Sequence, residues 1–211
     1  MPTIALPPPR ELELAPPEII PDLSTFQVED GLPVDSIYQG FQQQLLVDVL
    51  IASWAGPAPG RPFLVVHDCG LFYAADKPPV APDVMLSLDV ELEQLTDPLA
   101  RRSYFQWVIG KPPEVVIEMV SHTPGQEDSK KLDLYARIGV SYYLIFDPHH
   151  YLSAEELRVF ARQPLGLKRT ESRIMEQVGL GVVVWEGSYG GSHARWLRWT
   201  CLLYTSDAAD E

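Results

Sequence analysis

The sequence predicts an α/β domain, and three observations carry that prediction. Apolar residues make up 46% of the 211 residues, which is enough to bury a core and excludes a wholly disordered chain. A helical pattern over residues 35–55 precedes a series of short strand patterns. A strand, a helix and a second strand then follow one another over residues 114–146, which implies a right-handed parallel crossover.

The first predicted element is an amphipathic helix over residues 35–55. Its apolar residues recur at a spacing of three or four, with Phe41, Leu45 and Val49 on one stripe. Glycine and proline at residues 56–60 predict where the helix ends.

Strand patterns and one further helix account for the rest of the domain. The pattern over residues 126–138 predicts a helix, which Gly139 closes in the left-handed conformation. Thr123, Pro124 and Gln126 are expected at the N-cap, N1 and N3 positions of that helix. The predicted strands are residues 63–67, 71–73, 83–90, 114–120, 141–146, 157–161 and 181–185.

We expect one folded domain over residues 35–200. Residues 1–34 are rich in proline, which removes backbone donors and favours an extended segment. Residues 201–211 resemble a translated sequencing adapter, so we treat them as a non-native tail and expect the natural chain to be cut near residue 200. Signal-peptide and membrane-spanning patterns are missing, so we expect a cytoplasmic protein with no membrane partner.

The charge balance and the cysteines exclude several classes of protein. Lys and Arg number 16 against 29 Asp and Glu, which gives a net charge of −13. A basic protein that coats nucleic acid and a polybasic membrane anchor are therefore excluded. With only Cys69 and Cys201 present, we expect neither a disulfide-framed secreted domain nor a thiolate zinc site.

Two acidic residues are candidates for chemistry. Glu118 lies in a strand that is apolar on both faces, where an unpaired carboxylate costs on the order of several kcal/mol. It must be neutralised, paired or bound to a metal. Asp83 heads its own strand directly after Pro82, and two acids on adjacent strands can share a hard cation such as Mg²⁺. The alternatives are a structural ion pair at Glu118 and an ordinary turn at Asp83.

Lys131 is the third candidate. On the predicted helix, residues 131, 134, 135 and 138 share one side, so Lys131 borders the face that packs on the sheet. Lys130 lies on a wetter side. Lys131 is therefore better placed to point an ammonium at the carboxylates, and a snorkelling surface lysine is the alternative. Tyr135 is expected to be a core aromatic residue.

The remaining candidates are weaker. His149 and His150 point apart in an extended chain, so we do not expect a two-histidine metal site. His67 is expected to be structural or to form part of a cleft wall. Three tryptophans near two arginines either stack on nucleic-acid bases or pack in the C-terminal segment; they are Trp185, Trp196 and Trp199.

The order of these residues resembles the Uma2 family. The matching segments are Pro82–Asp83, Val116–Ser121, Lys131–Val140 and Tyr143–Pro148. Uma2 proteins are restriction-endonuclease-like proteins that are abundant in cyanobacteria and other bacteria. The resemblance implies an α/β fold with a restriction-endonuclease-like mixed β-sheet core flanked by α-helices.

The resemblance also implies a site of the PD-(D/E)xK type. Asp83 takes the place of the first acid and Glu118 that of the second, and both would hold Mg²⁺ or Mn²⁺ together with the Met119 carbonyl. The motif's lysine normally stands two residues after the second acid, where this chain has Val120. Lys131 matches the place on the following helix to which the family has moved it. The family's His-Gln pair is missing from residues 38–43, so no catalytic role is assigned there.

The predicted function is therefore metal-dependent hydrolysis of DNA phosphodiester bonds. The metal would acidify a water and stabilise charge on the phosphate, and Lys131 would orient that water or stabilise the developing oxyanion. A cleft made positive by the metal ion and by Lys130, Lys131, Arg101 and Arg102 would admit DNA despite the net charge. A homodimer is expected only by analogy with enzymes that cut both strands. The alternatives are an inactive nuclease-fold module that binds nucleic acid or regulates by interaction, and a scaffold protein with a structural ion pair.

Overall fold

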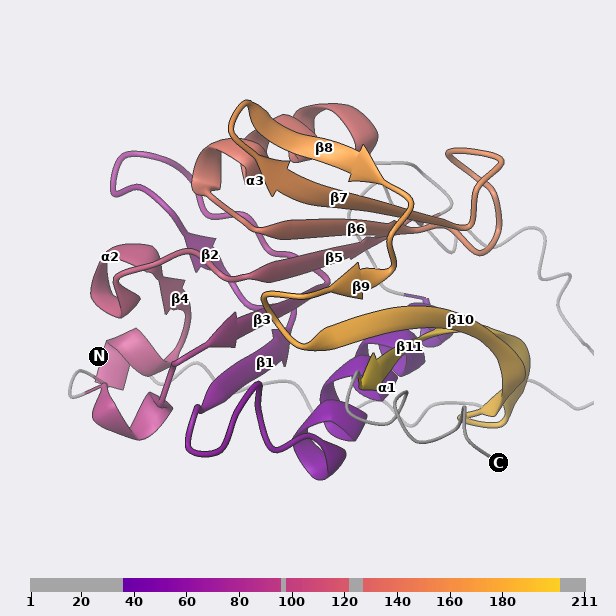
Figure 1. Cartoon of the computed structure of the whole chain (residues 1–211), viewed down its shortest axis with the longest axis horizontal. Coiled ribbons are helices and arrows are strands. Elements are labelled where there is room, and N and C mark those ends of the chain that lie inside the picture. The colour runs from indigo at the N-terminus through magenta and orange to yellow at the C-terminus, as the bar shows by residue number, and fades with distance from the viewer. Residues whose placement is uncertain (1–35, 96–97, 122–126, 202–211) are drawn as a thin grey trace, which may run out of the picture. The chain divides into compact units, whose positions relative to one another are not determined.

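The computed structural model describes residues 36–95, 98–121 and 127–201. There the chain forms a six-stranded mixed sheet, a three-stranded sheet and a two-stranded sheet, with helices packed beside them (Figure 1). The main sheet has the strand order β1, β3, β5, β6, β7, β8. This arrangement confirms the predicted α/β class with a mixed β-sheet core flanked by α-helices.

Helices and strands are interspersed along the described chain. The helical elements are α1 (Ile37–Ser53), the 3₁₀ turns η2 (Leu92–Gln94) and η3 (Pro98–Arg101), α2 (Gln106–Ile109), the π-helix η4 (Glu127–Lys131) and α3 (Leu132–Ile138). The strands are β1 (Phe63–His67), β2 (Leu71–Phe72), β3 (Val84–Leu88), β4 (Tyr104–Phe105), β5 (Val115–Met119), β6 (Tyr142–Phe146), β7 (Leu157–Gln163), β8 (Gly166–Thr170), β9 (Ile174–Met175), β10 (Leu180–Tyr189) and β11 (Ser192–Cys201).

The parallel pair β5 and β6 lies at the centre of the main sheet. Ile117 pairs with Leu144, and η4 and α3 connect the two strands, which confirms the predicted parallel crossover. All other neighbours in this sheet are antiparallel. Gly139 ends α3 with φ of +105°, and a Cβ there would lie 3.1 Å from a ring carbon of Pro112, so a glycine is required.

Two layers of core cover the two faces of the main sheet. One layer lies between the sheet and α1 with strands β9 to β11, and it includes Ile117 and Leu197. The other lies between the sheet and α3, and it includes Val116 and Tyr135. Because successive side chains of a strand point to opposite faces, Glu118 follows Val116 and faces the α3 side.

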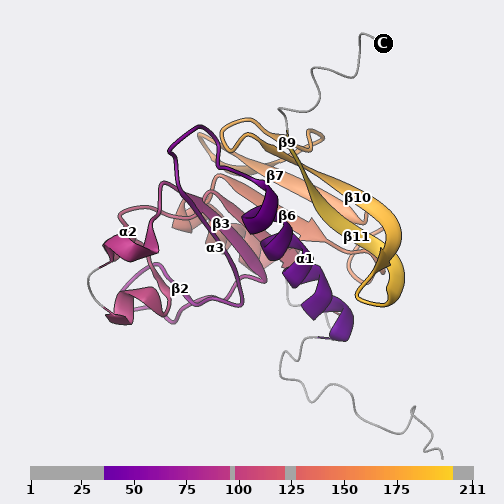
Figure 2. The same cartoon turned by 90° about the horizontal axis from the view of Figure 1, so that it is seen from below.

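Helix α1 buries Leu45 of its predicted apolar stripe, but its buried face also includes two glutamines that the stripe does not predict. Val49 is 37% exposed, whereas Gln42 and Gln43 are buried. The long β10–β11 hairpin lies beside the helix (Figure 2) and explains the difference. Gln42 donates to the Leu197 carbonyl at 2.9 Å and accepts from the Leu197 N–H at 2.8 Å. A glutamine therefore satisfies buried backbone groups that an apolar side chain would leave unpaired.

Replacement of Gln42 by Leu is expected to lower the free energy of unfolding by about 2–5 kcal/mol. The substitution keeps the volume but leaves both the N–H and the C=O of Leu197 buried without their partner. Chemical denaturation followed by circular dichroism measures the change. Gln44→Leu is the control, because Gln44 is exposed on the same helix. Equal stability of the two variants would contradict this account of the hairpin contact.

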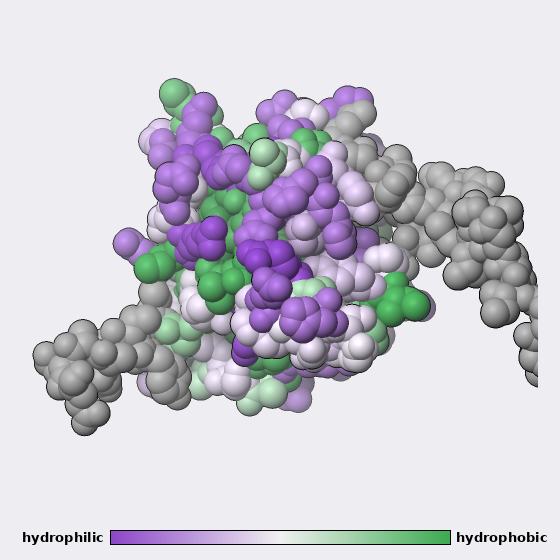
Figure 3. Space-filling model, turned by 90° about the vertical axis from the view of Figure 1, so that its right-hand side faces the viewer, coloured by the Kyte–Doolittle hydropathy of each residue, from purple (hydrophilic) through white to green (hydrophobic). Residues whose placement is uncertain are grey.

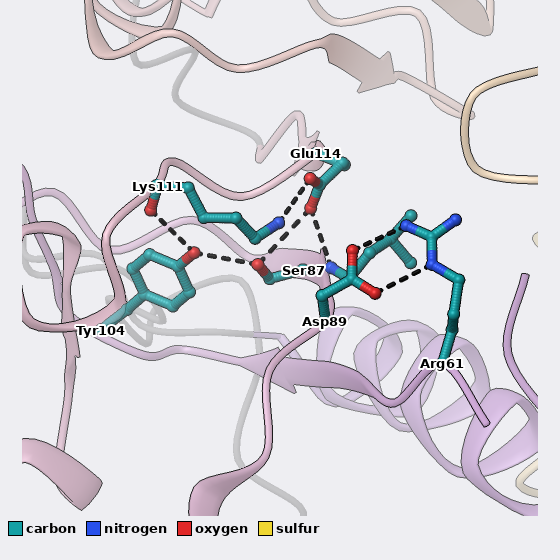
Figure 4. Close-up of polar contacts among 7 residues, drawn as sticks. Arg61, Ser87, Asp89, Tyr104, Lys111 and Glu114 are labelled. Atoms are coloured by element: carbon teal, nitrogen blue, oxygen red, sulfur yellow. Dashed lines mark hydrogen bonds and ion pairs between the residues drawn. The ribbon is translucent and has the colours of Figure 1, made fainter. Parts of the chain in front are cut away.

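A polar cluster lies where β3 ends and β5 begins, at the end of these strands that is remote from Glu118 (Figure 4). Tyr104 and Ser87 are buried and lie 2.9 Å apart through their hydroxyl oxygens. Glu114 accepts from the Leu88 N–H at 2.8 Å and from Lys111. Burial raises the pKa of Tyr104 above its ordinary range. Since Ser87 and Tyr104 are shielded from solvent, this cluster fixes β4 and α2 to the main sheet.

Several local predictions differ from the structure. Strands β4, β8, β9 and β11 lie outside the predicted strands, and β10 is longer than its predicted run. The helix predicted over residues 126–138 is π-helical over Glu127–Lys131 and α-helical only from Leu132. Its predicted cap residues Thr123, Pro124 and Gln126 lie outside the described residues. None of the helices in the described ranges is both long and apolar enough to cross a membrane.

Candidate active site

Asp83, Glu118 and Lys131 meet at one end of the main sheet. Lys131 Nζ lies 2.8 Å from Glu118 Oε2. Asp83 Oδ2 accepts a hydrogen bond of 2.5 Å from the backbone N–H of Met119, the residue after Glu118. The antiparallel register pairs Val84 with Ile117, so its continuation by one residue sets Asp83 opposite Glu118. The three residues chosen from the sequence therefore form one cluster.

Each of the three side chains is placed by its own element. Strand β5 is buried along its whole length, and Glu118 is only 1% exposed. Asp83 directly precedes β3, where the chain enters the sheet. Lys131 is the last residue of η4, the π-helical turn before α3. Single π-helical turns occur often at functional sites, and here the turn directs Lys131 toward the sheet while Lys130 is exposed.

Tyr135 belongs to the cluster, which the sequence did not predict. Its ring is buried as expected, but its hydroxyl also donates to Glu118 Oε1 at 2.5 Å. Glu118 thus has a different partner on each carboxylate oxygen, Lys131 and Tyr135. The residues one turn apart on η4 and α3 hold the carboxylate in one orientation.

Gln39 on α1 is a second member that the sequence did not reveal. Its side-chain amide donates to Asp83 Oδ1 at 3.2 Å. Ser36 caps α1 by accepting from the Gln39 N–H at 3.1 Å, so Gln39 sits in the first turn of the helix. No catalytic role is assigned to residues 38–43 from the sequence because the family's His-Gln pair is missing there, and helical periodicity does not reveal a contact 44 residues away.

Burial controls the ionisation of the cluster. The loss of solvent raises the pKa of Glu118 above its ordinary value, and Lys131 and Tyr135 oppose that rise only in part. Burial lowers the pKa of Lys131, but the carboxylates of Glu118, Glu127 and Asp83 together outweigh that effect, so the pKa is raised. Burial and the Glu118 charge also raise the pKa of Tyr135 well above its ordinary value, so its hydroxyl remains a donor.

Negative charge exceeds positive charge in this cluster. Glu127 lies 3.7 Å from Lys131 Nζ, and Asp83 also acts on that ammonium. The three carboxylates of Asp83, Glu118 and Glu127, when ionised, leave two negative charges in excess of the single ammonium. Such an excess of negative charge in a largely buried cluster favours the binding of a cation.

The donor chemistry suits a divalent ion of the magnesium type. Asp83 and Glu118 offer hard carboxylate oxygens from adjacent strands. Within the described ranges, no group of three or more His, Cys, Asp or Glu side chains could hold a metal ion. Mg²⁺ is commonly bound through one or two carboxylates, with waters and substrate phosphates as the other ligands. A pair of carboxylates therefore fits Mg²⁺ better than an ion that needs a full protein cage.

A cleft of about 540 Å³ lies between α1 and the end of β1. His67 and Asp68 line it, which agrees with the expectation of a cleft wall for His67. Gln43 donates to Asp68 at 2.9 Å, and the Asp68 N–H lies 3.3 Å from the Asp83 carbonyl oxygen. The cleft wall and the acidic pair are therefore linked through neighbouring strand ends.

The arginines predicted to line the cleft lie elsewhere. Arg101 is the last residue of η3, and Arg102 follows it shortly before β4. Figure 1 shows β4 on the left-hand side with α2, whereas β5 ends on the right. Arg101 instead donates to the Leu95 carbonyl at 2.9 Å. The prediction of a positive cleft that includes these two residues is wrong, because sequence proximity to the site strands does not determine which sheet end a loop reaches.

The C-terminal tryptophans are mainly packing residues. Trp196 is fully buried, and Trp199 Nε1 donates to the Leu46 carbonyl at 2.9 Å. Trp185 carries the guanidinium of Arg198 over its ring at 5.0 Å. Of the two predicted alternatives, the structure supports a packed C-terminal segment for Trp196 and Trp199.

Comparison with known proteins gives one family. The protein-family model Uma2, described as "Putative restriction endonuclease", matches residues 17–178, which is more than half of the chain. No curated protein matches the chain. The family description suggests a nuclease that acts on DNA, and restriction-endonuclease-like families generally use divalent metal ions. The chain therefore belongs to the Uma2 family.

Proposed function

We propose that this protein is a metal-dependent endonuclease that hydrolyses phosphodiester bonds of DNA. The observation that carries the proposal is the meeting of Asp83, Glu118 and Lys131 at one sheet end. Such a combination of two acids and one amine, largely removed from solvent, supports phosphoryl chemistry. A structural ion pair accounts for Glu118 and Lys131, but it gives no reason for Asp83 to face them.

Asp83 and Glu118 would hold the metal, with Mg²⁺ or Mn²⁺ as the ion. When bound, the ion would offset negative charge on the scissile phosphate and lower the pKa of a water. Gln39 and the Met119 N–H keep the Asp83 carboxylate in place. Tyr135 does the same for Glu118, so the site is organised before substrate arrives.

Lys131 has the role of orienting the attacking water or stabilising charge on the phosphate. Its ammonium is half-buried and held by carboxylates, and its raised pKa keeps it protonated at neutral pH. It therefore serves as a fixed positive charge and hydrogen-bond donor rather than as a general base. Removal of solvent around it strengthens its effect on a developing oxyanion.

A plasmid-nicking assay tests the proposal directly. Purified protein is incubated with supercoiled plasmid and Mg²⁺ or Mn²⁺, and with a chelator in parallel. The expected result is conversion to nicked or linear DNA only with the divalent ion. Binding of Mg²⁺ without any cleavage would favour the inactive nucleic-acid-binding module instead. If the protein neither binds Mg²⁺ nor cleaves DNA, the result would favour a structural ion pair between Glu118 and Lys131.

Affinity for Mg²⁺ is expected to rise with pH across a window above the ordinary range of a glutamate. Burial raises the pKa of Glu118, and a cation competes with the proton for that carboxylate. Below the raised pKa, affinity should fall by up to about tenfold per pH unit, and above it the affinity should level off. Isothermal titration calorimetry with Mg²⁺ over a series of pH values measures the curve.

The variant Glu118→Asp provides the matched comparison for this pH dependence. The shorter carboxylate is drawn back from Lys131 and Tyr135, so the Mg²⁺ affinity and its pH midpoint should both change. A wild-type affinity that is flat from acidic to neutral pH would remove Glu118 from the metal site.

A further inference from the structure

Exposed aromatic rings lie on the loop that follows β6. His149 is exposed and Tyr151 is 45% exposed, and their ring centroids lie 5.4 Å apart. His149 also contacts Tyr38 of α1 at 5.3 Å, and Tyr38 stacks on the buried ring of Trp196 at 4.8 Å. We call His149 and Tyr151 the aromatic platform. It has solvent on one side and a buried aromatic support on the other.

The platform loop is held in one conformation by Asp147. This carboxylate is fully buried and accepts three backbone N–H groups, from Tyr151 at 2.8 Å, Leu152 at 2.8 Å and Ser153 at 2.9 Å. His150 adopts φ of 57° and donates its N–H to the Asp147 carbonyl at 3.1 Å. A rigid loop that exposes two rings is suited to binding, because little conformational freedom remains to be lost.

The platform borders the acidic cluster. The Val120 N–H donates to the Phe146 carbonyl at 2.9 Å, so the strand ends that carry Glu118 and the loop lie side by side. Tyr38, which His149 contacts, directly precedes Gln39, the partner of Asp83. Figure 1 shows the β6–β7 loop on the right-hand side, where β5 ends. Figure 3 views that side and shows largely hydrophilic residues over its middle.

The negative charge of the protein favours DNA that binds through its bases rather than through its phosphates. The chain has a net charge of −13, and the site itself has an excess of carboxylates, so phosphate attraction contributes little to affinity. Stacking of a base on an aromatic ring does not depend on net charge and gives about a tenfold gain in affinity per base. The faces of a base in an intact duplex are covered by its neighbours, so only an unpaired base can use the rings.

We propose that the aromatic platform stacks an unpaired base of the DNA substrate and so directs the enzyme to DNA with a single-stranded segment at the scissile phosphate. This inference rests on the proposed function for its substrate. It assigns to His149 a ring-stacking role beside the site in place of a metal-ligand role. Tyr151 supplies the outer ring and Tyr38 supports the inner one.

Binding of labelled strands without metal tests the platform separately from cleavage. Fluorescence anisotropy is measured with an oligodeoxythymidine of about 16 nucleotides and with an abasic strand of equal length. Wild-type protein should bind the thymidine strand at least about tenfold more tightly. The double variant His149→Ala with Tyr151→Ala should lose that preference, and Tyr151→Phe should keep it. Trp107→Ala is the control, because Trp107 is 52% exposed and lies on α2 at the other side of the molecule (Figure 1).

The outcomes separate the platform from the nuclease. Equal affinity for the two strands, or a preference that survives the double variant, overturns the platform. A blunt duplex that is cut as fast as a duplex with a single-stranded tail overturns it as well. Base-dependent binding with no cleavage of any DNA would instead contradict the proposed nuclease and leave the platform as a base-binding site.

Discussion

Replacement of Asp83 by Asn, or of Glu118 by Gln, is expected to lower Mg²⁺-dependent DNA cleavage by about a thousandfold or more. Each change keeps the size of the side chain but removes one of the two carboxylates that face each other across β3 and β5. A metal ion contributes several kcal/mol to stabilising the charge of the transition state, and about 4 kcal/mol corresponds to a thousandfold in rate. Single-turnover cleavage of plasmid DNA measures the loss.

The control for this experiment lies on the same strand. Asp89 follows β3 at the end remote from the cluster, where it pairs with Arg61 at 2.6 Å in an exposed ion pair (Figure 4). Asp89→Asn makes the same chemical change in a solvent-exposed ion pair, which contributes little to stability, so cleavage should be retained. Cleavage that survives in both Asp83→Asn and Glu118→Gln would show that the activity does not arise from this cluster.

Five of the six strands of the main sheet and the central acid could be predicted because their signals are local. A run such as Val115–Met119 is apolar at every position but one, so it predicts both a buried strand and an exceptional Glu118. The position of Lys131 followed from helical periodicity, and its 2.8 Å contact with Glu118 agrees with that interpretation. The sequence could only suggest that Asp83 and Glu118 lie on adjacent strands. The register of β3 and β5 places them opposite each other.

What escaped prediction depends on contacts between distant parts of the chain. Gln42 is buried because its side chain pairs with the backbone of Leu197 in β11. The residues next to Gln42 in the sequence do not indicate that partner. Gln39 reaches Asp83 in the same manner. Strand β11 alternates charged and aromatic residues without a clear apolar face, since its hairpin packs on a helix rather than inside the main sheet. Polar residues that satisfy remote backbone groups give no periodic signal.

Replacement of Lys131 by Met is expected to lower the rate of cleavage at saturating DNA by about a hundredfold to a thousandfold. Methionine keeps the length of the side chain and removes the charge that lies 2.8 Å from Glu118. The loss of one positioned donor to a developing oxyanion costs a factor of this size. Loss of the ammonium also raises the pKa of Glu118 further, so the rates are compared at a pH at which calorimetry shows the site to be saturated with Mg²⁺. Calorimetry and single-turnover rates on the same preparation separate the two effects.

The neighbouring Lys130 makes this prediction specific. Lys130 is exposed, whereas Lys131 points at the carboxylates, so Lys130→Met removes the same charge one residue away without touching the cluster. The cleavage rate of Lys130→Met should stay near that of the wild type.

A purely neutralising role of Lys131 gives a different result. In that case Lys131→Met would lower stability and raise the pH needed for Mg²⁺ binding. Once loaded with Mg²⁺ at higher pH, however, the variant would cut at the wild-type rate. A rate that stays low under those conditions assigns Lys131 to the reaction itself, and Lys131→Arg, which keeps the charge, should then recover part of it.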